Sequence, residues 1–114
     1  MYRRILVPVD GSGTSMLGLK QALGLAQDQR ARVRVLNVID QLVVASAMDA
    51  YAGADAGALL QSLEAAGKDA IKAAGALAKQ SKVTADTAQV PSRGRHVSDV
   101  ILDDARKWRA DLIV

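Results

Sequence analysis

The fold of this chain is decided by the stretch RRILVPVDGSGTS, residues 3–15. A short apolar run ends in an aspartate and passes at once into Gly, Ser and Thr, and an amphipathic segment follows. This order is typical of a buried strand that enters a tight turn and then a helix. In open α/β sheets the turn after the first strand is where ligands usually bind. We therefore expect a strand over about Arg4–Val9 and a ligand site at its end.

The size and composition of the chain favour a single domain of the α/β class. The 114 residues are enough for one domain with one core. Hydrophobic residues make up 50% of the chain and aromatic ones only 3%, so the core must be built from Val, Ile, Leu and Ala, as suits a parallel sheet beneath Ala-rich helices. The chain has no Cys and one His, which excludes disulfides, thiolate metal sites and histidine-rich metal sites.

Charge and hydropathy bear on the partners and the location of the protein. No apolar run approaches the ~18 residues of a membrane span, and the first strand begins too early for a signal peptide to precede it, so we expect no membrane contact and a cytoplasmic location. The net charge is a mild +3. We expect Arg30, Arg32 and Arg34 to lie on a solvated sheet edge rather than to bind nucleic acid, because aromatic residues that could stack on bases are missing.

Strands and helices alternate along the chain, which implies right-handed crossovers and a parallel sheet. Residues 41–58, rich in Ala and Gly, are expected to form a long, adaptable loop with room for a short helical piece. The spacing of apolar residues predicts helices over residues 14–29, 59–82 and 97–108, and strands over residues 32–39, 83–90 and 111–114.

The glycine-rich turn after the first strand does not match the common phosphate-binding motifs. No Lys follows the glycines, so it is not a Walker A loop. Gly11 and Gly13 give G-x-G, but Met16 stands where a dinucleotide fingerprint has its third glycine.

Three blocks of sequence follow one another along nearly the whole chain: ILVPVDGS with Ser15, VLNVID at residues 35–40, and Gly94 and Ala105 with ADLIV at residues 110–114. A proline inside an apolar first strand is unusual, and the last block lies at its proper distance from the first. Together the blocks resemble the universal stress protein family. The resemblance implies one domain over residues 1–114 with an open, doubly wound, Rossmann-like parallel sheet of strand order 3-2-1-4-5, of the adenine-nucleotide alpha-hydrolase-like type.

The same resemblance implies a stress-response module that binds adenine nucleotide, namely ATP with or without Mg²⁺. Such a module acts as a sensor or regulator rather than as a dedicated enzyme, with slow ATP hydrolysis at most. In the ATP-binding branch, the acid after strand one contacts the nucleotide and the end of strand two offers backbone contacts to adenine. These positions fall on Asp10 and Val38. In addition, Pro8 and Val9 line the pocket, Gly11 and Ser12 belong to the turn, and Asp40 ends strand two. The candidate site residues are therefore Pro8, Val9, Asp10, Gly11, Ser12, Val38 and Asp40.

The ATP-binding branch also carries a glycine-rich phosphate loop after strand four, and family dimers commonly pair through the last strand. No residue follows Val114 in this sequence. We therefore expect a C-terminally incomplete domain that holds the adenosine half of the site and binds ATP weakly or not at all. Strand four then becomes an edge that is expected to pair with another chain, in a homodimer or another homo-oligomer.

Two other functions stay open at this point. The first is an interaction scaffold of the same fold that binds no nucleotide. The second is an enzyme of a related adenine-binding α/β fold, such as a nucleotide-dependent ligase or an electron-transfer flavoprotein subunit, which would need further domains.

The polar candidates also have ordinary structural roles. Asp10 can bond the N–H groups of its own turn, Ser12 can cap the helix that follows, and Asp40 can be a solvated turn acid. His96, the one imidazole, has no Ser or Cys nucleophile clearly paired with it. We expect it at the surface, and we predict no catalytic and no metal-binding residue.

Overall fold

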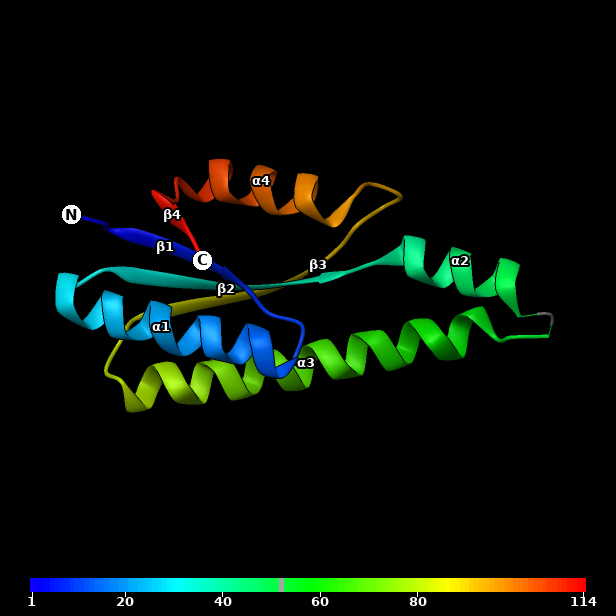
Figure 1. The fold of residues 1–114 in the computed structure, drawn as a ribbon, viewed down its shortest axis with the longest axis horizontal. Coiled ribbons are helices and arrows are strands. Elements are labelled where there is room, and N and C mark those ends of the chain that lie inside the picture. Colours follow the sequence, from blue (N-terminus) through cyan, green and yellow to red (C-terminus); the bar gives the residue numbers. More distant parts are fainter. Residues whose placement is uncertain (52) are drawn as a thin grey trace.

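The computed structural model describes residues 1–51 and 53–114 of the chain. Within these residues, the strands form one parallel sheet of order β3-β2-β1-β4, which confirms the expected 3-2-1-4 order (Figure 1). Strand β1 lies inside the sheet, with β4 at its side. The elements are β1 (Arg4–Pro8), α1 (Gly13–Gln29), β2 (Arg32–Ile39), α2 (Gln41–Ala50), α3 (Ala56–Gln80), β3 (Ala85–Pro91), α4 (Val97–Trp108) and β4 (Leu112–Ile113).

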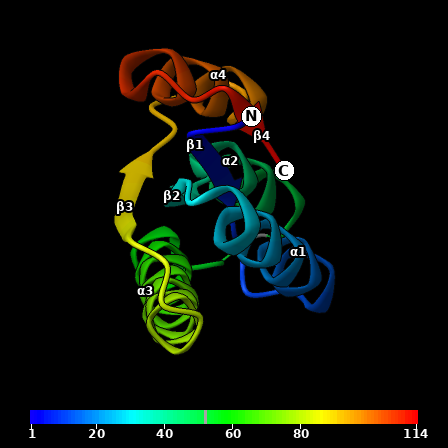
Figure 2. The same ribbon diagram turned by 90° about the vertical axis from the view of Figure 1, so that its left-hand side faces the viewer.

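Helices cover both faces of the sheet, with α1 and α3 on one face and α4 on the other (Figure 2). Successive residues of a strand point to opposite faces. Ile5 and Val7 therefore pack beneath α1 and α3, while Leu6 packs beneath α4. All three side chains are fully buried, which is why β1 is a continuous apolar run rather than an alternating one.

The predicted loop over residues 41–58 is largely wrong, because helix α2 fills Gln41–Ala50 and α3 begins at Ala56. The segment starts as a helix because the Asp40 carboxylate accepts a hydrogen bond from the N–H of Leu42 at 3.0 Å. It continues because alanine has the highest intrinsic helix propensity. Ala52, which belongs to the same predicted loop, lies outside the described residues.

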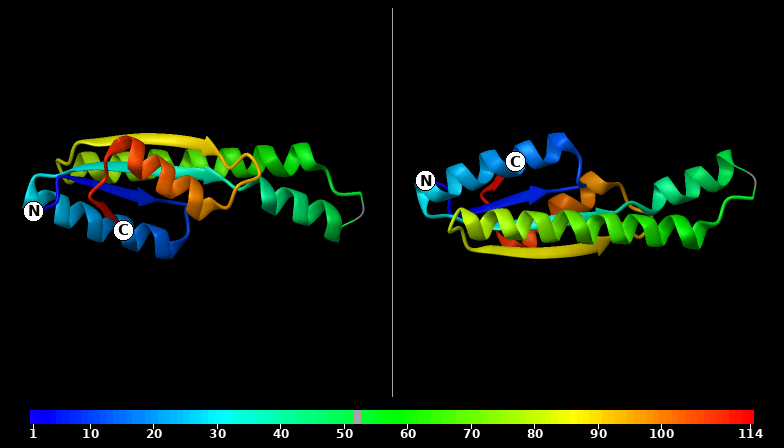
Figure 3. Two further views of the ribbon diagram at one scale, coloured as in Figure 1. Left: turned by 90° about the horizontal axis from the view of Figure 1, so that it is seen from above. Right: turned by 90° about the horizontal axis from the view of Figure 1, so that it is seen from below.

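Helix α2 and the first half of α3 extend beyond the carboxyl ends of the strands (Figure 3). The molecule is consequently elongated, with principal extents of 50 × 26 × 18 Å. No helix in residues 1–51 and 53–114 is both long and apolar enough to span a membrane.

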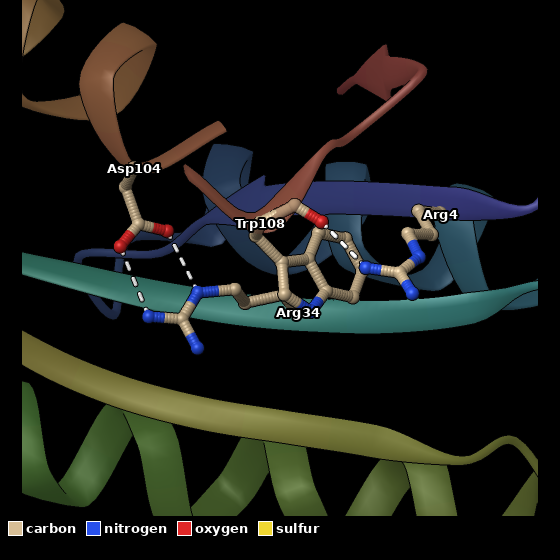
Figure 4. Close-up of polar contacts among 4 residues, drawn as sticks. All are labelled: Arg4, Arg34, Asp104 and Trp108. Carbon is tan, nitrogen blue, oxygen red and sulfur yellow. Dashed lines mark hydrogen bonds and ion pairs between the residues drawn. The ribbon is translucent and has the colours of Figure 1, made fainter. Parts of the chain in front are cut away.

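Arg34 does not lie on a solvated sheet edge, so that expectation is wrong. Strand β2 is an inner strand between β1 and β3, and the Arg34 guanidinium makes two hydrogen bonds to Asp104 of α4, at 2.7 and 2.9 Å (Figure 4). These hydrogen bonds raise the pKa of Arg34. Arg32 does remain exposed, paired with Asp86 at 3.5 Å.

Candidate functional site

A cleft of about 250 Å³ opens at the carboxyl end of β1, beneath α4. Strand β1 is flanked by β2 on one side and β4 on the other, so its carboxyl end is the switch point of the sheet, where ligands bind in open α/β folds. The residues that line the cleft are Pro8, Val9, Asp10, Leu36, Val38, Val97 and Ile101.

A larger hollow of about 460 Å³ lies at the other end of the sheet, where α1 and α3 end. Gln27, Arg30, Ser81 and Lys82 are among its lining residues. It lies at the amino ends of the strands, whereas ligands of open α/β sheets bind outside the carboxyl ends. The cleft at the carboxyl end of β1 is therefore the better candidate site.

The backbone of Val38 faces the open side of this cleft. The N–H of Arg32 donates to Arg3 O and the carbonyl of Leu36 accepts from Val9 N, so the peptide groups of even-numbered β2 residues point towards β1. The β1–β2 register ends at the pair Pro8 and Leu36. Val38, two residues further on, therefore offers one N–H and one C=O just past the end of β1, and neither has a hydrogen-bond partner among the described residues.

Asn37 is the reason why the two strands separate at this point. Its Nδ2 donates to the Val9 carbonyl at 2.9 Å, which is the acceptor that the Val38 N–H would otherwise take in a continued ladder. Its Oδ1 accepts from Nε2 of Gln89 at 3.1 Å, and the same nitrogen donates to the Glu64 carbonyl at 2.9 Å. Sequence reasoning missed Asn37, although an amide inside the apolar run VLNVI signals a buried polar group that needs partners.

The turn after β1 is built by its own side chains. The Asp10 carboxylate accepts from the N–H of Ser12 at 2.8 Å, and the N–H of Asp10 donates to Oγ of Ser15 at 3.3 Å. The Ser12 side chain caps α1 by accepting from the N–H of Ser15. Gly11 has a φ of +85°, which favours glycine. Asp10, Gly11 and Ser12 thus have structural roles in one turn, which for Asp10 and Ser12 are the ordinary roles expected from the sequence.

Asp10 belongs to the turn and also lines the cleft. Hydrogen bonds from Ser12, first from its side chain and then from its backbone, lower the pKa of Asp10. The carboxylate is therefore ionised at neutral pH and accepts hydrogen bonds without donating any.

Asp40 is not brought into the cleft. It caps α2 and lines an adjoining hollow of about 170 Å³ on the α3 face of the sheet, which shares Asp10 and Val38 with the cleft. Pro8, Val9, Asp10 and Val38 do meet at the cleft, while Gly11 and Ser12 shape the turn beside it.

Helix α4 forms the remaining wall of the cleft through Val97 and Ile101. It is held on the sheet by the Arg34–Asp104 ion pair and, at its last residue, by Arg4, whose Nη1 donates to the Trp108 carbonyl at 2.7 Å (Figure 4). The Arg4 guanidinium also lies over the Trp108 ring, 5.7 Å from its centroid. Sequence reasoning did not find these contacts, because their partners are about 70 and 104 residues apart.

The groups at the cleft suit the binding of a small molecule. Apolar walls, one carboxylate and a backbone donor beside an acceptor suit a flat heterocycle with a hydrogen-bonding edge and an attached hydroxyl group. Among the described residues, no three His, Cys, Asp or Glu side chains are grouped so that they could hold a metal ion. His96 is exposed at the start of α4 and makes no capping hydrogen bond there.

Comparisons with known proteins agree with this geometry. The model of the universal stress protein family matches residues 1–114. A universal stress protein family structure from Burkholderia pseudomallei is 29% identical, with a TM-score of 0.83 over 98% of this chain and 79% of its own. UspA from Lactobacillus plantarum is 28% identical, with a TM-score of 0.78 over 99% and 75%. A universal stress protein solved in complex with cAMP has the same fold at 19% identity, with a TM-score of 0.70 over 98% and 74%. No curated protein sequence matches the chain.

Proposed function

This chain belongs to the universal stress protein family, and we propose that its cleft at the end of β1 binds the adenosine part of an adenine nucleotide. The observation that carries the proposal is the free N–H and C=O of Val38. Adenine presents an amino donor next to a ring-nitrogen acceptor, which is the complement of this pair, whereas guanine presents a carbonyl acceptor in place of the amino donor. The apolar side chains above and below the cleft would hold the ring.

In this proposal Asp10 accepts a hydrogen bond from a ribose hydroxyl. Its carboxylate accepts hydrogen bonds from Ser12 within the turn, and a carboxylate has room to accept a further one. The low pKa of Asp10 suits an acceptor and makes it a poor general base. The cAMP bound by one solved relative supports an adenine nucleotide as the class of ligand.

We propose a nucleotide-dependent sensor or regulator of the stress response, acting in the cytoplasm as a homodimer or other homo-oligomer and taking ATP with or without Mg²⁺. The groups at the cleft favour binding over catalysis, because Asp10 is the only ionisable side chain among the described residues that line it. A nucleotide-independent scaffold is the second candidate, and it is favoured by the exposed apolar side chains Val43 and Tyr51 at α2.

Titration of ¹⁵N-labelled protein with ATP, and separately with GTP, tests the base recognition. ATP is expected to shift the backbone amide signals of Val38 and Val97, and GTP, which carries the same phosphates, is expected to leave them in place. Equal shifts with both nucleotides would indicate phosphate binding alone. No shift with millimolar ATP would favour the scaffold.

A pair of aspartate variants tests the role of Asp10. Asp10→Ala is expected to weaken ATP binding about tenfold, because it removes a hydrogen bond to a charged acceptor, with only a small change in melting temperature. Asp40→Ala is the matched control: it removes a helix cap outside the cleft, so it should lower the melting temperature without changing ATP affinity. If Asp10→Ala binds ATP as well as the unchanged protein, Asp10 is a turn residue only.

A further inference from the structure

Helix α2 and the first half of α3 form a projecting arm, whose described residues are 41–51 and 53–66 (Figure 3). The sequence of α2, QLVVASAMDA, is mostly apolar, and yet no residue of this helix is buried. The side chain of Val43 is 49% exposed and that of Tyr51, directly after the helix, is 70% exposed. Val43 lies in the first turn of α2 and Tyr51 is its C-terminal cap, so exposed apolar side chains stand at both ends of the helix, and we call this pair the apolar stripe of the arm.

The charge of the chain is divided between the arm and the rest of the molecule. Residues 41–66 contain three acidic residues and no Lys, Arg or His, so the arm carries −3. Because the net charge of the chain is +3, the remainder carries +6. A negatively charged arm is repelled by nucleic acid and by anionic membranes, and it is attracted to the rest of a second copy of this chain.

The two ends of the arm differ in the charges near them. At its tip are Asp49 in the last turn of α2 and Asp55, which caps α3. At its root lies the basic loop between β3 and α4, where the N–H of Arg93 donates to Oε1 of Gln41 at 2.6 Å. Arg93 and Arg95 are both exposed there. The ten residues of α2 separate tip from root by ~15 Å.

We propose that the arms of two copies of this chain pack antiparallel about a twofold axis. In that arrangement the tip of each arm, with Asp49 and Asp55, meets the root of the other, with Arg93 and Arg95. A parallel arrangement would instead place acid against acid. The stripes of Val43 and Tyr51 become buried against each other, as in the core of an antiparallel four-helix bundle, and the contact is self-complementary, as a twofold interface requires. The interface involves no residue of the nucleotide cleft and stands independently of nucleotide binding.

Sedimentation equilibrium of the full chain, at protein concentrations up to ~500 µM, tests the apolar half of the interface. A dimer is expected, and Val43→Glu should raise its dissociation constant about tenfold or more by placing a charge in the buried stripe. Leu102→Glu is the matched control, because Leu102 is 45% exposed but lies on α4, and the dimer should tolerate it. Circular dichroism checks that each variant is folded.

Charge reversal tests the tip-to-root pairing. A tip variant with Asp49→Lys and Asp55→Lys should be monomeric, and so should a root variant with Arg93→Glu and Arg95→Glu. An equimolar mixture of the two should restore the dimer, because each tip then meets a root of opposite charge, and salt should weaken the original and restored dimers alike. A chain that stays monomeric at every concentration overturns the proposal. So does a dimer that neither Val43→Glu nor the charge variants weaken.

Discussion

At the scale of single residues, Gly67 marks the closest approach of α3 to the sheet. A Cβ built on Gly67 would lie under 3.0 Å from Oδ1 of Asn37 and from Nε2 of Gln89. Both atoms are held by hydrogen bonds to each other, and Asn37 is buried. The absence of a side chain at Gly67 therefore lets the polar network form that separates β1 from β2 at the candidate site.

Gly67→Ala is expected to lower the free energy of unfolding by ~1–3 kcal/mol, because there is no free space for the added methyl group. Gly75→Ala is the control in the same helix, since nothing lies within 4 Å of its Cβ position. That change should stabilise the protein by ~0.5–1 kcal/mol through helix propensity. Urea unfolding measures both, and equal effects would contradict the steric argument.

Asp111 ties the start of β4 to the N-terminal residues. Its carboxylate accepts from the N–H groups of Arg3 at 2.9 Å and Arg4 at 3.0 Å, and these hydrogen bonds lower the pKa of Asp111. A carboxyl group with a lowered pKa stabilises the folded state above its unfolded pKa of about 3.9, and this contribution is lost as the pH falls through the folded pKa.

The melting temperature of the protein should therefore fall as the pH drops below about 4. Asp111→Ala should lower the melting temperature at pH 7 and make the remaining fall with acid shallower. Asp28→Ala, at an exposed position of α1, is the comparison. A pH profile of Asp111→Ala parallel to that of the unchanged protein would show that these hydrogen bonds do not contribute to stability.

At the scale of elements, α4 depends on polar contacts for its position. Only Val100 and Ala105 of this helix are buried, so it has less apolar contact with the sheet than the opposite face receives from α1 and α3. Its attachment is completed by the ion pair between Arg34 and Asp104, whose side chains are 21% and 15% exposed. This pair sets where the α4 wall of the cleft lies.

Asp104→Ala is expected to cost ~1–3 kcal/mol, because it leaves the Arg34 guanidinium half-buried without its partner. The double change Arg34→Met with Asp104→Leu should recover most of that loss, since replacing both members of a shielded pair by apolar groups is often neutral. The exposed pair between Arg95, which precedes α4, and Asp103 of that helix is the control, and Arg95→Ala should change stability little. Thermal unfolding measures the stability of all these variants. A double variant as unstable as Asp104→Ala would contradict the expected recovery.

The bounds of helices and strands were predicted correctly where neighbouring residues determine them. Strand β2 matches residues 32–39 at both ends, and α1 begins directly after the Ser12 cap. The prediction of a loop over residues 41–58 failed because runs of Ala and Gly are compatible with both loop and helix. Helix α2 depends on the Asp40 cap and on contact with α3.

At the scale of the whole molecule, the sheet has two different outer edges. Among the described residues, β4 has a single neighbouring strand, β1, and its Ile113 and the following Val114 are 40% and 42% exposed. An open strand edge with apolar side chains is a site for pairing with another chain. Such pairing rests on backbone hydrogen bonds and apolar contact, so salt should not weaken it, unlike the contact between the arms.

Ile113→Lys should therefore reduce whatever association persists at high salt, because a charge on an edge strand opposes pairing. Light scattering at high salt measures this, with Leu17→Lys as the control, since Leu17 is 63% exposed on α1. If association at high salt persists in the Ile113→Lys variant, the contact between copies lies elsewhere on the surface.

The amino-acid sequence by itself determined the parallel α/β class and the succession of strand, turn and helix at the start of the chain, while the strand order followed from the resemblance to universal stress proteins. Buried parallel strands are continuous apolar runs, and turn and cap residues act within a few positions, so these local features can be read from the chain. Tertiary structure alone decided that Arg34 binds Asp104, that Asn37 separates β1 from β2, and that Val38 is left with a free donor and acceptor. These outcomes depend on residues far apart in the chain that only packing brings together, and no local pattern encodes which partner a buried polar group will find.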